Sequence, residues 1–292
     1  MLQNIAIHGR KLNPQAIPFI EELLRSLLDK GAKVCLSEIL VTNNIDWISK
    51  YNFPTYVVYD HVAQFDLFIS IGGDGTFLET LTHVGKHEIP ILGVNTGRLG
   101  FLASTSKEQI GKAMDSLFKG NFVEDKRSLL YLESNSSLFD GINFALNEFS
   151  IVRKETSSMI VIKTFLDGEF LNTYWADGLM VATPTGSTGY SLSCGGPILL
   201  PHTNNFVITP VSPHNLNIRP LIVSDASELT FEVESRNSNF LVTLDSRSQA
   251  AEESMFLKLK KAPFRANIIK MEGVNFIETL RSKLSWGLDR RN

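Results

Sequence analysis

The stretch FDLFISIGGDGTFLETL, residues 65–81, decides the fold of the first part of the chain. Its opening run, FDLFISI, is apolar on both faces, as parallel strands are. The run stops at Gly72-Gly73-Asp74-Gly75-Thr76, and an apolar-periodic segment follows. A buried strand, a tight glycine turn and a helix start predict one unit of an α/β domain.

Neighbouring segments repeat this alternation of strand and helix. NIAIHG (4–9), AKVCLS (32–37) and IPILGVN (89–95) predict further strands. Residues 14–31 predict an amphipathic helix that ends at a glycine. Together they predict a doubly wound, Rossmann-like parallel sheet.

The pattern changes after residue 103. Residues 105–120 predict one more helix, and residues 128–270 predict a series of short strands. Regular strands with turn punctuation favour an all-β, sandwich-like domain. Within it, Asp167-Gly168 predicts a hairpin turn.

The tail VNFIETLRSKLSWGL, residues 274–288, predicts an amphipathic helix, whose return to the first domain is implied by a family resemblance given below. We therefore predict an α/β domain of residues 1–103, completed by residues 272–292. Residues 104–271 form the mainly β domain in this prediction.

Composition narrows the class of protein. The chain has 292 residues, a net charge of −3 and 43% hydrophobic residues, so no global basic field favours nucleic acid or an anionic membrane. The local basic stretch is Lys258, Lys260, Lys261 and Arg265, and its alternation with leucines fits the solvent-exposed face of a strand. No apolar run approaches the ~18 residues that span a bilayer. With no secretory leader, and with only Cys35 and Cys194, we expect a cytoplasmic protein with reduced thiols.

The glycine turn predicts phosphate chemistry. Backbone N–H groups at a helix N-terminus favour phosphate, and glycines leave no Cβ to block it. Asp74 would repel that phosphate, so it should hold Mg²⁺ or accept a proton from an attacking hydroxyl. Both roles indicate phosphoryl transfer. The alternative is that Asp74 only caps the helix, but three glycines exceed what a cap needs.

Two further segments are unusual. YWADGLMVATPTGSTGYSLSCGGPIL (174–199) gathers hydroxyls and glycines that suit the base and ribose of a nucleotide, although alone it also fits a glycine-rich sandwich loop. Asn147-Glu148 lies within a strand, where a bulge could aim both at a ligand and the alternative is a polar strand edge. We interpret His83 and His87 as surface histidines.

These segments together resemble the NAD kinase family. GGDGT alone is weak, because lipid kinases and phosphofructokinases carry similar loops, but its combination with the asparagine–glutamate pair and TPTGSTGYS is specific. The matching stretches are GGDGTFL (72–78), NTGRLGFL (95–102), LNEFSI (146–151), DGLMVATPTGSTGYSLSCGGPIL (177–199) and SPHNLNIRPLIV (212–223).

The resemblance implies phosphorylation of the 2′-hydroxyl of the adenosine ribose of NAD by ATP, giving NADP and ADP and controlling the NAD/NADP balance. It implies a divalent cation, Mg²⁺, and a homo-oligomer, a dimer or a tetramer. NAD and ATP are then the small-molecule partners, with no nucleic acid and no membrane.

The resemblance also implies roles for single residues. Asp74 would be the proton acceptor, and Asp74-Gly75 would touch NAD. Asn147 and Glu148 would hydrogen-bond the dinucleotide, and Asp177 would bind its nicotinamide side. No metal ligand is assigned. The implied adenosine pocket is Thr188, Gly189, Tyr190, Ser191, Leu192 and Ser193, and the implied phosphate-donor loop is Gly72, Gly73, Gly75 and Thr76.

The sequence departs from the family at a few positions. Gly189 stands where alanine is common, Arg247 where many relatives have glutamine, and Trp175 where some place a basic residue. The choices between NAD and NADH and between ATP and polyphosphate stay open. Two alternative functions are a lipid kinase, disfavoured by the lack of a basic amphipathic segment, and a non-catalytic dinucleotide sensor, disfavoured by Asp74.

Overall fold

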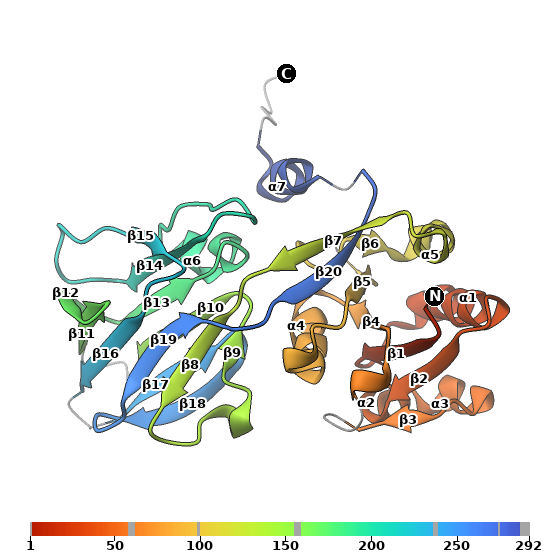
Figure 1. Ribbon diagram of the computed structural model, residues 1–292, viewed down its shortest axis with the longest axis horizontal. Helices are drawn as coiled ribbons and strands as arrows, with labels where there is room; N and C mark the ends of the chain where they lie inside the picture. Colours follow the sequence, from red (N-terminus) through yellow and green to blue (C-terminus); the bar gives the residue numbers. More distant parts are fainter. Residues whose placement is uncertain are drawn as a thin grey trace. The chain divides into compact units, whose positions relative to one another are not determined.

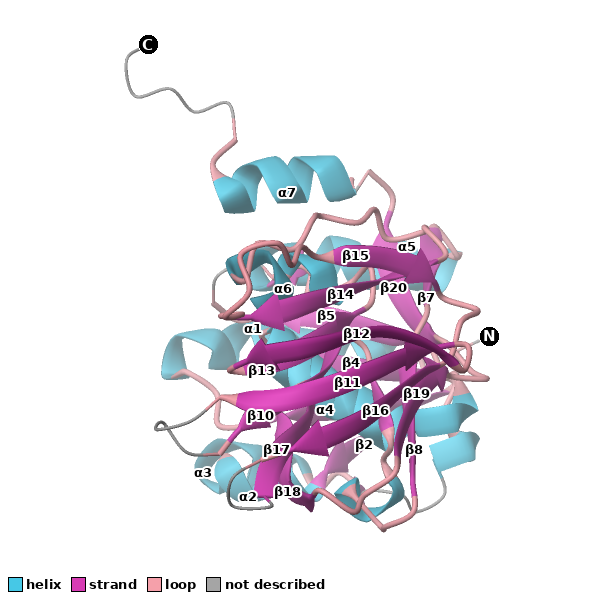
Figure 2. Cartoon of the chain, turned by 90° about the vertical axis from the view of Figure 1, so that its left-hand side faces the viewer, coloured by secondary structure: helices cyan, strands magenta, loops and turns pink. Residues whose placement is uncertain are grey.

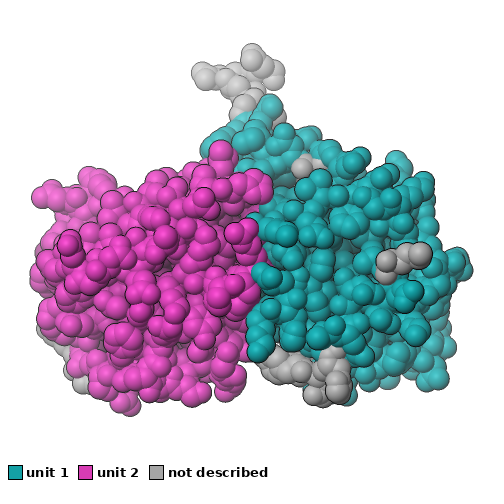
Figure 3. Space-filling model, in the orientation of Figure 1, with its two compact units in different colours: residues 1–126, 266–292 teal, residues 127–265 magenta. Residues whose placement is uncertain are grey.

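The computed structural model describes residues 2–57, 62–97, 100–154, 159–235, 239–273 and 275–286. The chain divides into two compact units, coloured separately in Figure 3. Unit 1 comprises residues 1–126 and 266–292, and unit 2 comprises residues 127–265.

Unit 1 is built on a sheet with the strand order β3-β2-β1-β4-β5-β20-β7, in which β6 pairs with β5 (Figure 1). Neighbouring strands from β3 to β20 pair in parallel, as the apolar strand runs predicted. The strands are β1 (Asn4–Gly9), β2 (Lys33–Ser37), β3 (Thr55–Tyr56), β4 (Leu67–Gly72), β5 (Ile91–Asn95), β6 (Thr105–Ser106), β7 (Phe122–Arg127) and β20 (Ala266–Met271).

Helices connect and cover these strands. The predicted helix of residues 14–31 is a short 3₁₀ turn followed by α1, which buries Leu23, Leu24 and Leu27. The α-helices are α1 (Ile17–Asp29), α2 (Glu38–Asn43), α3 (Ile45–Ile48), α4 (Asp74–Val84), α5 (Ile110–Lys119) and α7 (Phe276–Leu284), and the 3₁₀ turns are η1 (Pro14–Ala16), η2 (Ser49–Tyr51), η3 (Val62–Gln64), η4 (Gly85–His87) and η5 (Lys107–Gln109).

The direction of strand succession reverses between β1 and β4. From β1 the chain moves outward to β2 and β3, and then returns to place β4 and β5 on the other side of β1. At such a switch point open α/β sheets bind ligands beyond the carboxyl ends of the strands. The glycine turn at residues 72–75 follows β4 directly and therefore lies at this position.

Unit 2 consists of two six-stranded sheets (Figure 2), and apolar side chains from both form one core. The strand orders are β15-β14-β13-β10-β17-β18 and β12-β11-β16-β19-β8-β9, and neighbouring strands pair antiparallel. Its elements are β8 (Leu130–Ser134), η6 (Phe139–Gly141), β9 (Phe144–Ala145), β10 (Glu148–Arg153), β11 (Ile160–Leu166), β12 (Glu169–Ala176), β13 (Gly178–Ala182), η7 (Gly186–Thr188), α6 (Tyr190–Ser193), β14 (Asn205–Val211), β15 (Leu221–Ser224), β16 (Leu229–Glu234), β17 (Asn239–Leu244), β18 (Arg247–Glu252) and β19 (Leu257–Lys261).

The hairpin prediction is confirmed. Leu166 pairs with Glu169, so Asp167 and Gly168 form a two-residue turn between β11 and β12. Both have positive φ, +52° and +84°, the conformation that this turn requires. The lysines of β19 also behave as predicted: Lys258 pairs with Glu228 while the neighbouring leucines are buried.

The limits of the units differ from the predicted ranges 1–103, 104–271 and 272–292, because β6, η5, α5, β20 and nearly all of β7 also lie in unit 1. The three strands join its sheet, in which β20 pairs in parallel with β5, Ile268 opposite Ile91. The tail helix α7 also belongs to unit 1, where the rings of Phe276 and Phe101 lie 6.4 Å apart. Among the described residues no helix is long and apolar enough to cross a membrane.

Candidate active site

The first glycine of the turn after β4 is required for steric reasons within the protein, whether or not a ligand binds. Gly72 has φ +156°, and a Cβ there would overlap Oγ1 of Thr76 in the first turn of α4. No side chain other than hydrogen fits between the end of the strand and the start of the helix. Gly72 and Thr76 therefore set the tight path of this turn.

Gly73 and Gly75 have no such internal reason to be glycine. A Cβ at either position would meet no atom within 4 Å, and neither residue has positive φ. Gly73 is the N-cap of α4, where glycine is favoured over alanine, but Gly75 lies inside the first turn, where glycine costs up to about 1 kcal/mol relative to alanine. Both positions leave bare backbone, and so room for a ligand against the amides of the helix N-terminus.

Asp74 is the first residue of α4, and its carboxylate is held by the loop after β5. Oδ2 accepts the N–H of Phe101 at 2.9 Å, and Oδ1 accepts those of Leu102 and Ala103 at 3.0 and 3.1 Å. A Cβ on Gly100 would overlap Oδ1. The stretch NTGRLGFL (95–102), of which Arg98 and Leu99 lie outside the described residues, thus contributes the glycine and two of the amides that fix this carboxylate.

These bonds limit what Asp74 can do. Its two oxygens have about four lone-pair positions, and three are taken, so Oδ2 keeps one position for a ligand hydroxyl. The helix-cap alternative is not what the structure has, since the carboxylate of Asp74 accepts from amides of the loop after β5 and not from those of α4. A carboxylate with one open position does not fit a resident Mg²⁺ site made by the protein, so we assign it no metal.

In unit 2, Asn147 and Glu148 are positioned by one buried carboxylate. Asp245, in the turn between β17 and β18, accepts the N–H groups of Leu146, Asn147 and Glu148 at 3.0, 2.7 and 3.3 Å. Burial raises the pKa of Asp245, against these bonds. Burial and the charge of Asp245 raise the pKa of Glu148 to about 8, so its carboxyl is mainly neutral at pH 7.

The PTGSTG turn packs against this pair. A Cβ on Gly186 would overlap the carbonyl oxygen of Asn147, and the ideal Cβ of Gly189 would lie 3.6 Å from Oε2 of Glu148. Thr183 donates its N–H to Asn147 O at 2.9 Å. Arg127 donates to Oγ1 of Thr185 at 2.9 Å. The structure therefore brings together two segments that lie about 40 residues apart, as the nucleotide-site prediction requires.

The residues of the predicted adenosine pocket differ in their exposure to solvent. Gly189, Tyr190 and Ser193 are exposed, whereas Ser191 is buried and its hydroxyl lies 2.9 Å from that of Thr209. Thr188 is half-buried, with Oγ1 donating to Thr185 O at 3.3 Å, and Leu192 is half-buried. A ligand on this surface meets Gly189, Tyr190 and Ser193 first.

Asp177 lies apart from Glu148. The two residues are at opposite ends of the β10–β13 pair, because Glu148 is opposite Ala182 while Arg153 follows the pairing of Val152 with Gly178. Arg153 pairs with Asp177, with Nε 3.1 Å from Oδ1 and an NH2 bond of 3.2 Å to Oδ2. Asp177 thus carries a partly buried ion pair at the far end of the strands.

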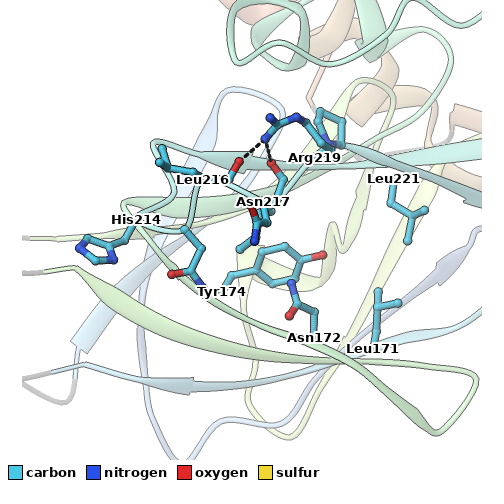
Figure 4. Close-up of a pocket in the computed structure, with 11 residues that line it drawn as sticks. Leu171, Asn172, Tyr174, His214, Leu216, Asn217, Arg219 and Leu221 are labelled. Atoms are coloured by element: carbon cyan, nitrogen blue, oxygen red, sulfur yellow. Dashed lines mark hydrogen bonds between the residues drawn. The ribbon is translucent and has the colours of Figure 1, made fainter.

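A groove of about 810 Å³ opens elsewhere in unit 2 (Figure 4). Its lining comes from β12 and from the stretch SPHNLNIRPLIV, with Tyr174, His214 and Arg219 among the labelled side chains. The guanidinium of Arg219 donates to the carbonyls of Leu216 and Ile218. None of the predicted nucleotide contacts lines this groove.

One histidine interpretation is wrong. His87 is exposed as expected, but His83 is only 3% exposed, because its side chain lies on the face of α4 that packs on β1. Burial and the neighbouring His8 lower the pKa of His83 to about 3. Helical spacing alone did not show which face of α4 is covered.

The chain also matches two family profiles over most of its length. Residues 5–122 match the ATP-NAD kinase N-terminal domain, and residues 146–271 match the ATP-NAD kinase C-terminal domain. The chain belongs to the NAD kinase family. Family membership confirms the resemblance inferred from the glycine turn, the asparagine–glutamate pair and the PTGSTG turn.

Among curated relatives, the NAD kinase of Cytophaga hutchinsonii is 47% identical over 98% of this chain and 99% of its own. That of Flavobacterium psychrophilum is 44% identical over 99% of both. The solved structure of an Archaeoglobus fulgidus NAD kinase in complex with ATP has a TM-score of 0.73 at 25% identity, covering 97% of this chain and 99% of that one. Yeast NADH kinase complexed with NADH has a TM-score of 0.85 at 23% identity, covering 99% and 89%, and shows the shared fold.

Sequence reasoning missed the residues that position the site. Asp245 holds Asn147 from 98 residues away, and the amides of residues 101–103 hold Asp74 from 27 to 29 residues away. The signal for Asp245 was its place in a two-residue turn between apolar runs, LVTLDSRS. The signal for the amides was Gly100, a glycine with no turn of its own to make.

Proposed function

We propose that this NAD kinase transfers the γ-phosphoryl group of ATP to the 2′-hydroxyl of the adenosine ribose of NAD, with Asp74 positioning that hydroxyl. Because the chain belongs to the NAD kinase family, it phosphorylates NAD with ATP to give NADP and ADP. The bond from the ribose 2′-oxygen to phosphorus forms while the bond to the ADP oxygen breaks. The hydroxyl proton leaves toward the carboxylate.

The observation that supports the role of Asp74 is its fixed carboxylate, which lies between two glycines with open space beside their backbone. Three amide bonds hold its orientation, and one lone-pair position on Oδ2 stays open to accept the ribose hydroxyl. Phosphoryl transfer passes through a loose transition state and depends mainly on positioning. An oriented acceptor that takes the proton late suits that demand better than a strong base.

The donor side is assigned to Gly72, Gly73, Gly75 and Thr76. The N-terminus of α4 presents backbone N–H groups and the positive end of its dipole, which favour phosphate. We assign Mg²⁺ to the phosphates of ATP, where a divalent cation neutralises charge, and to no cage of protein ligands. No step of the mechanism is derived through the metal.

The dinucleotide side is assigned to unit 2. Asn147 offers an amide, and Glu148, mainly neutral at pH 7, offers both a donor and an acceptor to ribose hydroxyls. Gly189, Tyr190 and Ser193 expose backbone, ring and hydroxyl for the adenosine, with Thr188, Ser191 and Leu192 behind them. Asp177 is assigned to the nicotinamide side, and Asp74-Gly75 also contact NAD.

Two further expectations belong to the same proposal. We expect a homo-oligomer and a cytoplasmic location. Size-exclusion chromatography with light scattering tests the first, and fractionation of the source cells tests the second.

The decisive experiment incubates purified, untagged protein with ATP, Mg²⁺ and NAD and detects NADP by a coupled NADP-specific assay. Parallel reactions replace NAD by NADH or by a lipid alcohol, and ATP by polyphosphate. We expect NADP to form only with the dinucleotide and the phosphate donor together. Labelled phosphate in the lipid instead would support the lipid kinase, and dinucleotide binding with no product would support the sensor.

A further inference from the structure

A buried cluster of two histidines and a glutamate lies in unit 1, outside the residues assigned to either nucleotide. His8 is on β1, and Glu79 and His83 are one helical turn apart on α4. One ligand atom from each lies within 4.8 Å of the others. We propose that His8, Glu79 and His83 bind a Zn²⁺-type transition-metal ion that fastens helix α4 to strand β1.

His8 carries the first argument, because it is fully buried and half-satisfied. Its Nδ1 lies 3.0 Å from Oγ of Ser37, but its Nε2 makes no hydrogen bond although it is buried. Nε2 lies 3.3 Å from Oε2 of Glu79, outside hydrogen-bond geometry. A buried polar atom without a partner is rare in native proteins and indicates a missing ion or water.

A second orphan atom lies beside the first. Ser70 on β4 is opposite His8 in the parallel register, so the two side chains leave the same face of the sheet. Its hydroxyl is buried and makes no hydrogen bond. Two buried polar atoms on paired residues of neighbouring strands, neither with a hydrogen bond, mark a polar position that an ion with a bound water would satisfy.

The two imidazoles are held as metal ligands usually are. The hydroxyl of Tyr56 lies 3.3 Å from Nδ1 of His83, as Ser37 does from Nδ1 of His8. When Nδ1 donates to its hydroxyl, Nε2 keeps a lone pair for a metal. The rings meet edge to face with centroids 4.3 Å apart, which brings both to one side of α4.

Glu79 completes the set and faces solvent through Arg10. Arg10 donates to both carboxylate oxygens, at 2.7 and 3.0 Å, from a side chain that is 68% exposed. The amide of Asn44 holds the main-chain carbonyl of Arg10, but among the described residues the guanidinium bonds only to Glu79, so the side chain can leave when a dication replaces it as the counter-charge. The guanidinium of Arg10 therefore competes with the metal for Glu79.

The donor set selects the kind of ion. Two imidazole nitrogens and one carboxylate oxygen with an open fourth position suit Zn²⁺, whereas Mg²⁺ and Ca²⁺ prefer oxygen ligands. Bonds of about 2.1 Å in a tetrahedron separate ligand atoms by about 3.4 Å. Small side-chain rotations bring atoms that already lie within 4.8 Å to that spacing.

The test titrates Co²⁺, as a coloured substitute for Zn²⁺, into untagged, chelator-stripped protein. We expect one equivalent to bind with an absorption band of low-coordinate Co²⁺, Zn²⁺ to displace it and Mg²⁺ not to. Zn²⁺ should raise the melting temperature and a chelator should reverse the rise. A missing band, or no shift in melting with Zn²⁺, overturns the proposal.

Variants locate the site. His83→Gln and Glu79→Gln should abolish the band, and Tyr56→Phe should weaken binding by ~10–100-fold by removing only the outer hydroxyl. His87→Gln, at an exposed histidine four residues beyond His83, is the matched control and should bind normally. Arg10→Ala should bind more tightly, which loss of a merely structural contact would not produce.

Circular dichroism of the stripped variants separates loss of binding from loss of folding. If His83→Gln does not fold, Tyr56→Phe and Arg10→Ala decide, because neither empties the core. Binding that is unchanged in Tyr56→Phe and in Glu79→Gln would show that the ion sits elsewhere. In that case the cluster is a buried ion-pair network, and the proposal is wrong.

Discussion

Oδ2 of Asp74 accepts the backbone N–H of Phe101 at 2.9 Å, and this bond joins the two most recognisable glycine stretches of unit 1. The ring of the same Phe101 lies 6.4 Å from that of Phe276 on α7. The proposed catalytic carboxylate is thus held by a loop that the C-terminal helix contacts. A substitution that removes either of these contacts should therefore disturb the position of the Asp74 carboxylate.

Asp74→Asn should fold and bind NAD but lose ~10²–10⁴-fold in turnover, the usual range for a lost proton acceptor. The new amide NH₂ faces at least one backbone N–H, so the free energy of unfolding should also fall by about 1–3 kcal/mol. Steady-state kinetics and urea unfolding measure both. Asp46→Asn, at an exposed aspartate in the first turn of α3, is the control. Wild-type turnover in Asp74→Asn would remove this residue from the mechanism.

Gly100→Ala should disable the enzyme without touching a substrate. Its Cβ would overlap Oδ1 of Asp74, so the carboxylate must move and lose amide bonds. We expect turnover to fall by at least ~10²-fold, as for loss of the carboxylate itself. Gly97→Ala is a matched control for stability, since its Cβ would meet only Asn95 Oδ1, at 4.0 Å. Equal melting temperatures and turnover of Gly100→Ala and wild type would contradict the described geometry.

Gly75→Ala should separate stability from function. Nothing lies within 4 Å of the added methyl, and alanine is favoured over glycine in helices by up to about 1 kcal/mol, so stability should hold or rise. The KM for ATP should rise because the methyl occupies space beside the helix amides. Gly111→Ala in α5, where the Cβ meets only the end of the Glu22 side chain, should change stability alone. An unchanged KM in Gly75→Ala would show that no phosphate comes close to this position.

Glu148 should make stability fall as pH rises. Its pKa is raised from 4.5 to about 8 on folding, so the unfolded chain releases this proton first. Between about pH 4.5 and 8 the free energy of unfolding should drop by up to about 1.4 kcal/mol per pH unit from this group. Glu148→Gln should remove the slope and be more stable than wild type at pH 8.

Unfolding of the wild type, of Glu148→Gln and of the control Glu169→Gln, at an exposed residue of β12, would be compared from pH 5 to pH 9. The same slope in wild type and in Glu148→Gln would mean that Glu148 is charged in the folded state. Glu169→Gln should keep the wild-type slope, because Glu169 is exposed at the start of its strand.

Local patterns predicted much of this fold. Strand β1 has the predicted limits 4–9, and the hairpin at Asp167-Gly168 has the predicted turn, because both depend on neighbouring residues. The parallel pairing of β20 with β5 could not be predicted, since a six-residue strand does not encode which sheet it joins. The same holds for the bonds to Asp74, which depend on how far the loop after β5 folds back over α4.

The site residues were predicted by type rather than by environment. That Glu148 is mainly neutral follows from its burial and from Asp245, 97 positions away, and no local pattern records either. Likewise His83 looked like a surface residue until the face of α4 that packs on β1 was known. The motifs predicted which side chains take part in the reaction. The protonation of Glu148 and the orientation of Asp74 depend on contacts that are distant in the sequence.

The place of β20 has a consequence for synthesis on the ribosome. The chain leaves unit 1 after β7 and supplies β20, the neighbour of β5, only after all of unit 2 has been made. At about 5–20 residues per second, the roughly 140 residues of unit 2 take on the order of ten seconds to translate. During that time β6 can already pair with Val94 and Asn95, but Ile91 and Leu92 of β5 still lack the strand that will cover them, and such an open edge is a site for pairing with other polypeptides.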